Sequence, residues 1–432
     1  MNSNEIDRLG FRKKQAMAYK YLLEGRNIFL TGNAGTGKSY VIQKFIEWCD
    51  SKDKNVVITA PTGIAALNIQ GVTLHRAFKV PIGPLVEEIK SISGILRVAD
   101  VVIIDEISMC RIDLFEYVAK QIIYANMLRR RSGEPDIQFI VVGDFLQLPP
   151  VMLKEDREVL EQYYKKPLGY GYAFQSKLWK ACGFIGINLD ETVRQSDEIF
   201  ANNLTQARLG DQRCLDYFYK NSCKTEMKKA IMLCGTNKAV KEKNDLELSL
   251  LPTDEIIYNS LIIGEVKESD KAVDDEIHLK LGARVMLTIN DPEGKYSSGS
   301  MGTILKLKDS SIVVVLDSKK EVEIERYTWS IKGYALEEVT DEDGNTTTKL
   351  EMKEIGSFSQ LPIKLAYAIT IHKSQGQTYD EVNIDPYCWD CGQLYVALSR
   401  CKSIDKIHFT RMINPAYLKA SKLVLNFYKE FA

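Results

Sequence analysis

Short apolar runs separated by segments of helical periodicity dominate the first 190 residues of the chain. Residues 12–24 are predicted to form a helix that ends at Gly25, and a second helix is predicted from Lys38 to about Cys49. Four apolar runs have the length of buried strands: "NIFLTG" (27–32), "NVVITA" (55–60), "VVIID" (101–105) and "QFIVVG" (138–143). Because strands and helices alternate, the pattern predicts a parallel sheet with helices on both faces.

The same alternation returns after residue 190, but a different pattern interrupts it. "AIMLCGTN" (230–237) is typical of a buried strand, whereas the segment 255–360 contains several short strands separated by Gly, Asn and Asp. Within that segment a long hairpin is predicted to turn near Asp343–Gly344–Asn345. The α/β pattern resumes at "IKLAYAITIHKSQG" (363–376). We therefore expect a first α/β domain at 1–190, a second at 191–254 and 361–432, and a β module inserted at 255–360.

Charge and cysteine content narrow the possible classes of protein. The 432 residues carry a formal net charge of -1, so any site for a polyanion must be a local basic groove. Nine scattered cysteines argue against a disulfide framework and favour a reducing compartment. Cys388 and Cys391 form one CxxC without the second pair, or the histidines at ligand spacing, that a zinc site needs, so two small loop residues are favoured over a metal or redox role. No apolar stretch of about 18 residues is present, so we expect a cytosolic chain without a membrane partner.

The sequence "GNAGTGKS" after the first predicted strand fits the phosphate-loop pattern GxxxxGK[ST]. Its glycines let backbone N–H groups point at phosphate oxygens, and the following helix adds its positive end. Lys38 is expected to reach the β- and γ-phosphates of ATP, and the Ser39 hydroxyl to bind Mg²⁺. The predicted nucleotide-binding residues are Gly32, Asn33, Ala34, Gly35, Thr36, Gly37, Lys38 and Ser39.

Two further segments supply groups for ATP hydrolysis. In "VVIIDEISM" the Asp105 carboxylate can hold Mg²⁺, and Glu106 can act as the general base for the attacking water. In "VVGDFLQLPPV" the Gln147 amide can orient that water and sense the terminal phosphate, although a solvated loop amide remains open as an alternative.

An arginine supplied from another domain can stabilise the charge that develops on the γ-phosphate, an effect worth roughly 10³–10⁵ in rate. Arg400, at the end of the apolar run "GQLYVALSRC", is one candidate. Arg194, in "LDETVRQ", is a second. For both, a purely structural ion pair is the alternative.

Taken together, these segments resemble the superfamily 1 helicases and are most similar to the Pif family of 5′-to-3′ DNA helicases. The resemblance rests on the order of "GNAGTGKS", "ITAPTGIAALNIQGVTLH", "IIDEISM", "GDFLQLPPV", "AYAITIHKSQGQT" and "GQLYVALSRC". It implies an α/β fold of two RecA-like domains of the P-loop NTPase type. It also implies a small wedge insertion at about 64–85 in the first domain and an SH3-like β-barrel as the inserted module. Gln15 matches the glutamine that reads adenine before the phosphate loop.

The resemblance also implies a track for single-stranded DNA, in which phosphate contacts position the strand and apolar side chains wedge against bases. Residues in the matching motifs are candidate DNA contacts, namely Pro61, Thr62, Thr73, His75, Phe78, Thr370, His372 and Lys373. For Phe78 a place in the core is the favoured alternative.

The leading hypothesis is an ATP-dependent helicase, acting as a monomer on single-stranded DNA and on tailed or forked duplexes. One alternative is a single-strand translocase that strips proteins but unwinds poorly. Another is an RNA-stimulated ATPase that acts as a binding switch. The direction of travel comes from the resemblance alone.

Overall fold

The chain divides into two compact units in the computed structural model, which describes residues 9–81, 83–87, 89, 92–191, 197–340 and 346–430. The first unit comprises Met1–Arg194, Gly333–Lys353 and Ser421–Ala432. The second comprises Gln195–Lys332 and Glu354–Ala420.

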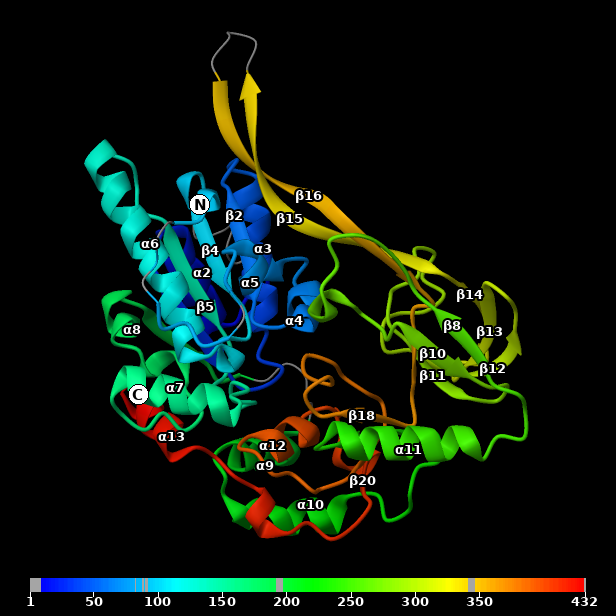
Figure 1. Ribbon diagram of the computed structural model, residues 1–432. Coiled ribbons are helices and arrows are strands. Elements are labelled where there is room, and N and C mark those ends of the chain that lie inside the picture. The colour runs from blue at the N-terminus through cyan, green and yellow to red at the C-terminus, as the bar shows by residue number, and fades with distance from the viewer. Residues whose placement is uncertain are drawn as a thin grey trace. The chain divides into compact units, whose positions relative to one another are not determined.

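A parallel sheet of six strands is the centre of the described part of the first unit (Figure 1). Its strand order is β3-β2-β4-β5-β1-β6, and each neighbouring pair is parallel. The strands are β1 (Ile28–Gly32), β2 (Val56–Ala60), β3 (Val72–Thr73), β4 (Val101–Ile104), β5 (Gln138–Val142) and β6 (Ile185–Leu189). The four apolar runs predicted as strands correspond to β1, β2, β4 and β5, so this part of the prediction is confirmed.

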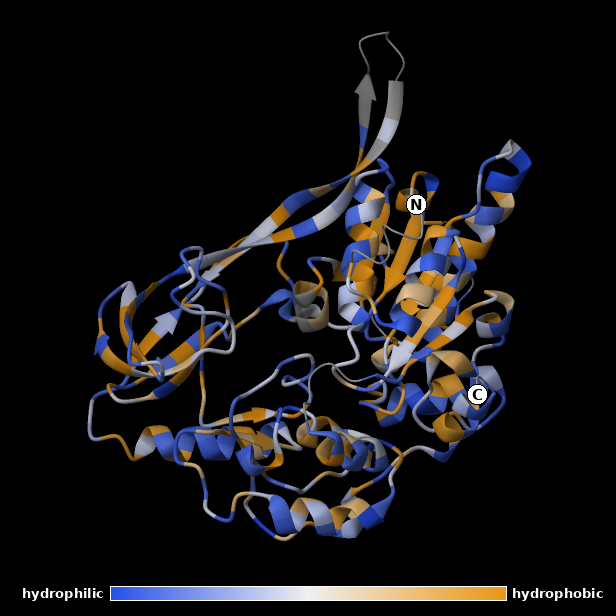
Figure 2. Cartoon of the chain, turned by 180° about the vertical axis from the view of Figure 1, so that it is seen from behind, coloured by the Kyte–Doolittle hydropathy of each residue, from blue (hydrophilic) through white to orange (hydrophobic). Residues whose placement is uncertain are grey.

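Alternate side chains along each strand face opposite sides of this sheet. Ile28 and Leu30 of β1 join a core cluster with side chains of α2 (Lys13–Leu23) and α3 (Lys38–Asp50). Phe29, which lies between them, packs its ring against Trp179 of α8, and Trp179 in turn contacts Phe115 of α6. Figure 2 shows these strands as largely hydrophobic ribbon. The helices of this unit are α2 (Lys13–Leu23), α3 (Lys38–Asp50), α4 (Gly63–Asn68), α5 (Leu74–Ala77), α6 (Ile112–Ser132), α7 (Lys154–Tyr164), α8 (Lys177–Ala181) and α13 (Lys422–Lys429).

The second unit contains, within its described residues, a smaller parallel sheet of order β18-β7-β19-β20. Its strands are β7 (Ile231–Cys234), β18 (Ala368–Thr370), β19 (Val382–Ile384) and β20 (Ile407–Phe409). Its helices are α9 (Glu198–Arg208), α10 (Leu215–Asn221), α11 (Asn237–Ser249) and α12 (Gln393–Leu398). The strands come from both sides of the β module, so this sheet is interrupted in sequence.

The interrupting module is built from antiparallel strands around a separate hydrophobic core. Its described strands are β8 (Ile256–Asn259), β9 (Leu261–Gly264), β10 (Glu276–Leu279), β11 (Arg284–Leu287), β12 (Met301–Leu307), β13 (Ser311–Leu316), β14 (Glu321–Glu325), β15 (Tyr327–Thr340), β16 (Thr346–Gln360) and β17 (Ile363–Leu365). β17 pairs with β11, so the module extends past residue 360. β15 and β16 are the arms of the predicted hairpin, whose expected turn at 343–345 lies outside the described residues.

Two segments group with the first unit, although the sequence pattern assigned them to the later domains. In β15, the Tyr334 hydroxyl accepts a hydrogen bond from Ile58 N (2.8 Å) and donates one to Val56 O (3.4 Å). The helix α13 buries Val424 and Phe427, and Phe427 packs on aromatic rings of the first unit. The reason is packing: an amphipathic helix or hairpin encodes an apolar face, but its local pattern does not say which core that face joins.

Candidate nucleotide site and nucleic-acid interface

The phosphate loop connects the end of β1 to the start of α3, and two of its glycines cannot be replaced without a clash. A Cβ on Gly32, where φ is +145°, would lie 2.3 Å from Leu189 O. A Cβ on Gly37, where φ is +82°, would lie 2.5 Å from the Gln15 side-chain nitrogen. The Thr36 hydroxyl closes the loop by donating to Asn33 O at 2.9 Å. The loop is therefore shaped by backbone geometry, as the motif predicts.

Lys38 folds back over this loop. Its Nζ donates hydrogen bonds to Gly32 O (2.8 Å) and Asn33 O (3.1 Å), so the ammonium is held at the mouth of the loop by carbonyl oxygens. Ser39, the next residue, is exposed on the first turn of α3. A phosphate bound here would meet the charge of Lys38 and the N-terminal end of a 13-residue helix.

Gln15 lies beside the loop, at the position expected for reading adenine. Its side chain is buried, and its amide is engaged at both ends: Nε2 donates to Thr36 O (2.9 Å) and Oε1 accepts from Arg12 N (2.9 Å). The residues that surround Gln15 on this side of the loop are Arg12, Lys14, Thr36, Leu189, Asp190 and Glu191. In this structure the amide supports the phosphate loop, and its role in reading adenine stays a prediction.

The acidic pair follows β4. Burial raises the pKa of the Asp105 carboxyl, while the Glu106 N–H and the charge of Lys38 act in the opposite direction. The Glu106 amide donates to Asp105 Oδ1 at 2.9 Å, and Glu106 itself has the left-handed φ of +50°. Such a conformation costs a non-glycine residue about 1–3 kcal/mol and is concentrated at functional sites.

The glutamine loop follows β5 and touches the acidic turn. A Cβ on Gly143 would lie 2.9 Å from Ile107 N, which shows how closely the two backbones approach. Gln147 is buried, and its N–H donates to Asp144 O at 2.9 Å. Because β4, β5 and β1 are neighbours in a parallel sheet, their carboxyl ends bring the acidic pair, the glutamine loop and the phosphate loop to the same edge.

Of the two candidate arginines, the structure describes only Arg400. Arg194 lies outside the described residues. Arg400 is 1% exposed, and its guanidinium donates to Val396 O (2.8 Å), to Ser374 O and Gln377 O (3.1 Å each), and to Ser399 Oγ (2.7 Å). These four partners are neutral groups of the second unit. The catalytic role of Arg400 stays a prediction.

The DNA-contact candidates of the first unit are partly engaged in local structure. The hydroxyls of Thr62 and Thr73 cap α4 and α5 by accepting from Ala65 N (3.3 Å) and Arg76 N (3.4 Å). Phe78 is 2% exposed, so its ring is a core side chain and is not available to stack on a base. Pro61 and His75 are half-buried.

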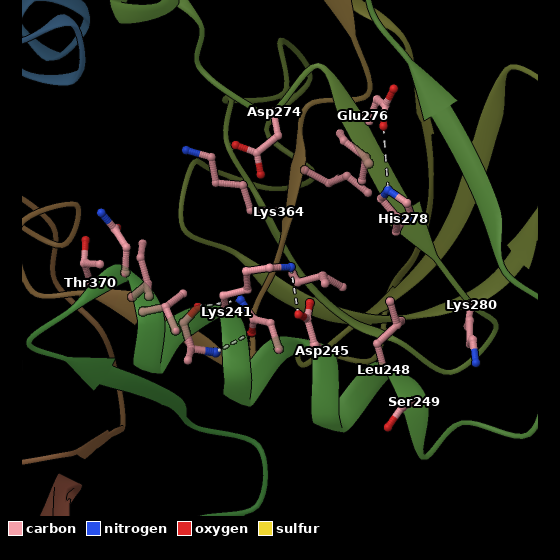
Figure 3. A pocket seen from close by; sticks show the side chains of 18 of the residues that line it. Lys241, Asp245, Leu248, Ser249, Asp274, Glu276, His278, Lys280, Lys364 and Thr370 are labelled. Carbon is pink, nitrogen blue, oxygen red and sulfur yellow. Dashed lines mark hydrogen bonds and ion pairs between the residues drawn. The ribbon is translucent and has the colours of Figure 1, made fainter.

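In the second unit, Thr370 and Lys373 line a cavity of about 750 Å³ formed by α11, β10 and the segments around β17 and β18 (Figure 3). His372 is half-buried and does not line it; burial lowers the pKa of its imidazole, and Asp390 opposes this. Lys364 also lines the cavity, with its ammonium drawn beside the Asp274 carboxylate in Figure 3. Sequence reasoning did not single out Lys364, because a lysine inside a short strand carries no signal of its own.

Two findings concern the expected lack of a membrane span and the CxxC at Cys388 and Cys391. No helix in the described ranges is long and apolar enough to cross a membrane. The described residues also contain no cluster of three or more His, Cys, Asp or Glu side chains arranged to hold a metal ion. Cys388 is buried, and desolvation raises the pKa of its thiol, which suits a packed residue better than a zinc ligand.

A phosphate loop, an acidic pair and a glutamine loop on one parallel sheet, with a second α/β unit interrupted by a β module, define a P-loop ATPase of the helicase class. The model of the family described as "PIF1-like helicase" matches residues 11–211 of the chain. The ATP-dependent DNA helicase Pif1 of Campylobacter jejuni is 30% identical over 94% of each chain, and that of Bdellovibrio bacteriovorus is 30% identical over 97% of this chain and 91% of its own.

Solved structures of Pif1 helicases also resemble this chain. The crystal structure of Bacteroides sp Pif1 in complex with ADP-AlF4 covers 97% of this chain and 96% of its own, with a TM-score of 0.80 and 31% identity. Pif1 helicase from Candida albicans has a TM-score of 0.71 and 28% identity over 98% of this chain and 99% of its own. The chain belongs to the PIF1-like helicase family and is an ATP-dependent DNA helicase with the two-domain RecA-like fold.

Proposed function

We propose that this helicase hydrolyses ATP with Mg²⁺ to move 5′ to 3′ along single-stranded DNA and to unwind tailed or forked duplexes. The observation that carries the proposal is the shared edge of β4, β5 and β1, where three motifs meet. The relatives named above support the direction of travel only through family membership, and structures of Bacteroides Pif1 bound to single-stranded DNA support the type of substrate.

In the proposed reaction Lys38 binds the β- and γ-phosphates, and the amides of the phosphate loop surround them. Glu106 accepts the proton of the attacking water, and Gln147 orients that water. Burial raises the pKa of the neighbouring Asp105 carboxyl, and the charge of a bound cation would act in the opposite direction.

The donor set suits Mg²⁺, which prefers carboxylate and hydroxyl oxygens and keeps several waters. Asp105 and Ser39 would hold the ion, which would neutralise phosphate charge. Arg400 and Arg194 remain the proposed arginines for the γ-phosphate. Gln15 remains the proposed adenine reader, which requires its amide to leave or share the bonds to Thr36 and Arg12.

We propose that the strand is held by Pro61, Thr62, Thr73 and His75 in the first domain and by Thr370, His372 and Lys373 in the second. The segment 64–85 acts as a wedge, and the inserted β module acts as an SH3-like barrel flanking the strand. Phe78 is dropped from this set because its ring is buried. The unwinding species is proposed to be a monomer, which sedimentation of the protein–DNA complex would test.

Strand displacement tests the proposal directly. Two duplexes that differ only in carrying a 5′ or a 3′ single-stranded tail are incubated with the protein, Mg²⁺ and ATP. Unwinding of only the 5′-tailed duplex is expected. Unwinding of only the 3′-tailed duplex would overturn the proposed polarity, and DNA-stimulated hydrolysis without any unwinding would favour the single-strand translocase. The Lys38→Ala chain is the control for contaminating helicases.

A further inference from the structure

The C-terminal helix α13 reaches the nucleotide loops through the hydroxyl of Tyr428. This oxygen lies 2.7 Å from Thr31 Oγ1, accepts a hydrogen bond from Phe145 N (3.1 Å) and donates one to Asp144 Oδ1 (3.2 Å). A phenol has one proton and two acceptor positions, so these three contacts use its full capacity, with the Thr31 hydroxyl as donor. Thr31 directly precedes Gly32, the first glycine of the phosphate loop.

Asp144, on the other side of this bridge, begins the loop that carries Gln147. Its side chain is 0% exposed, and Oδ1 also accepts from Leu146 N at 3.1 Å. Its carbonyl oxygen accepts from Gln147 N at 2.9 Å. The backbone position of Gln147 therefore depends on where the Asp144 residue is held.

Aromatic packing restricts the movement of the hydroxyl. Phe427, the neighbour of Tyr428, stacks on Phe174 with ring centroids 4.1 Å apart and an interplanar angle of 14°. The Tyr428 ring itself stacks on Phe29 at 6.4 Å. Because its neighbours lock the rotamer of Tyr428, the hydroxyl is a fixed point between the two loops. It can therefore hold the Asp144 carboxylate at a set position relative to Thr31.

We infer that Tyr428 is a positioning residue for ATP hydrolysis, which holds the glutamine loop in register with the phosphate loop. The inference rests on the proposed role of Gln147 in orienting the attacking water. The second unit ends at Ala420 and α13 follows at once, so the covalent chain leads directly from the second unit to this bridge. The family motifs do not include this residue, and the hydroxyl links elements almost 400 positions apart in sequence.

A double-mutant cycle on the DNA-stimulated ATPase tests the inference. Tyr428→Phe keeps the ring and removes only the hydroxyl. We expect kcat to fall roughly tenfold, on the scale of small misplacements of catalytic groups, while KM for ATP changes less than about twofold. In a Gln147→Ala background, where the group being positioned is gone, Tyr428→Phe should have almost no further effect on the residual rate. Phosphate release from radiolabelled ATP measures both rates.

Tyr164→Phe is the matched control. It removes a hydroxyl that bonds Glu116 Oε2 at 3.1 Å in the same unit, away from the nucleotide loops. Thermal melting of both variants separates stability from rate: kcat should fall only in Tyr428→Phe. An equal loss of kcat in both backgrounds, or in Tyr164→Phe, would assign the hydroxyl a structural role and overturn the inference. If the unmodified chain shows no DNA-stimulated hydrolysis, the proposed function fails and the inference falls with it.

Discussion

Arg400 donates a hydrogen bond from Nη1 to the backbone oxygen of Ser374 at 3.1 Å, inside the second unit. Ser374 belongs to the segment "ITIHKSQG", and Arg400 ends "GQLYVALSR", so two helicase motifs are joined by one buried guanidinium. The planar guanidinium has five N–H donors in a fixed geometry, so one buried arginine can satisfy carbonyl oxygens from both motifs at once. This arrangement orders the two motifs whether or not the same side chain also reaches a phosphate.

Arg400→Ala is expected to reduce ATP hydrolysis by about 10³-fold or more if the guanidinium stabilises the γ-phosphate. Binding of ATP should stay near normal. Because the change also removes the hydrogen bonds from the guanidinium to Val396, Ser374, Gln377 and Ser399, the melting temperature should fall as well. Hydrolysis, nucleotide binding and thermal melting are measured on the same preparation. Hydrolysis that survives in a destabilised protein would make the arginine structural.

Lys38→Ala should lower DNA-stimulated hydrolysis by at least about 100-fold, the scale on which removing one preorganised charge-stabilising donor acts. Binding of a labelled single strand should persist, because the candidate DNA contacts do not include Lys38. ATPase rates and fluorescence anisotropy measure the two effects. Retained hydrolysis would remove the phosphate loop from the catalytic site.

Lys364→Met should weaken binding of single-stranded DNA and make the slope of log K against log salt less negative by about 0.7, the value for one phosphate contact on a single strand. Lys364 lines the same cavity as the candidate DNA contacts Thr370 and Lys373, so its ammonium would meet a phosphate bound there. Lys241→Met is the matched control, because Lys241 lines the same cavity but is paired with Asp245 at 2.8 Å. Equal slopes for Lys364→Met and the unmodified chain would exclude Lys364 from the DNA contacts.

The pH dependence of DNA binding follows from the same side chain. Burial, together with the nearby charge of Lys373, lowers the pKa of Lys364 from its ordinary value to about 8. A phosphate binds the protonated form, so affinity for single-stranded DNA should decrease as pH rises through about 8. Lys364→Met should lose this component of the pH profile. Binding titrations between pH 7 and 9 at constant ionic strength would measure the difference, and identical profiles would contradict the prediction.

Local sequence was enough for the elements whose determinants are local. A phosphate loop needs glycines at fixed spacing between a strand and a helix, and Gly32 and Gly37 show why: a Cβ at either would meet Leu189 O or Gln15 within 2.5 Å. Strands of a parallel sheet buried on both faces read as continuous apolar runs. The fold class could be predicted on this basis, whereas the family and the helicase activity were expected from the resemblance of the ordered motifs to the Pif family.

Tertiary structure alone decided which distant side chains meet. Phe78 lies in a motif that suggests DNA contact, yet packing buries its ring. The helix α13 follows the second domain in sequence, yet Phe427 and Tyr428 pack on the first. The sequence did not predict this, because an apolar helix face can pack on any apolar core. By itself the sequence determined the chemistry that each motif can perform, because that depends on residue type and spacing. Burial and partners depend on contacts between residues hundreds of positions apart, and only the folded chain brings those together.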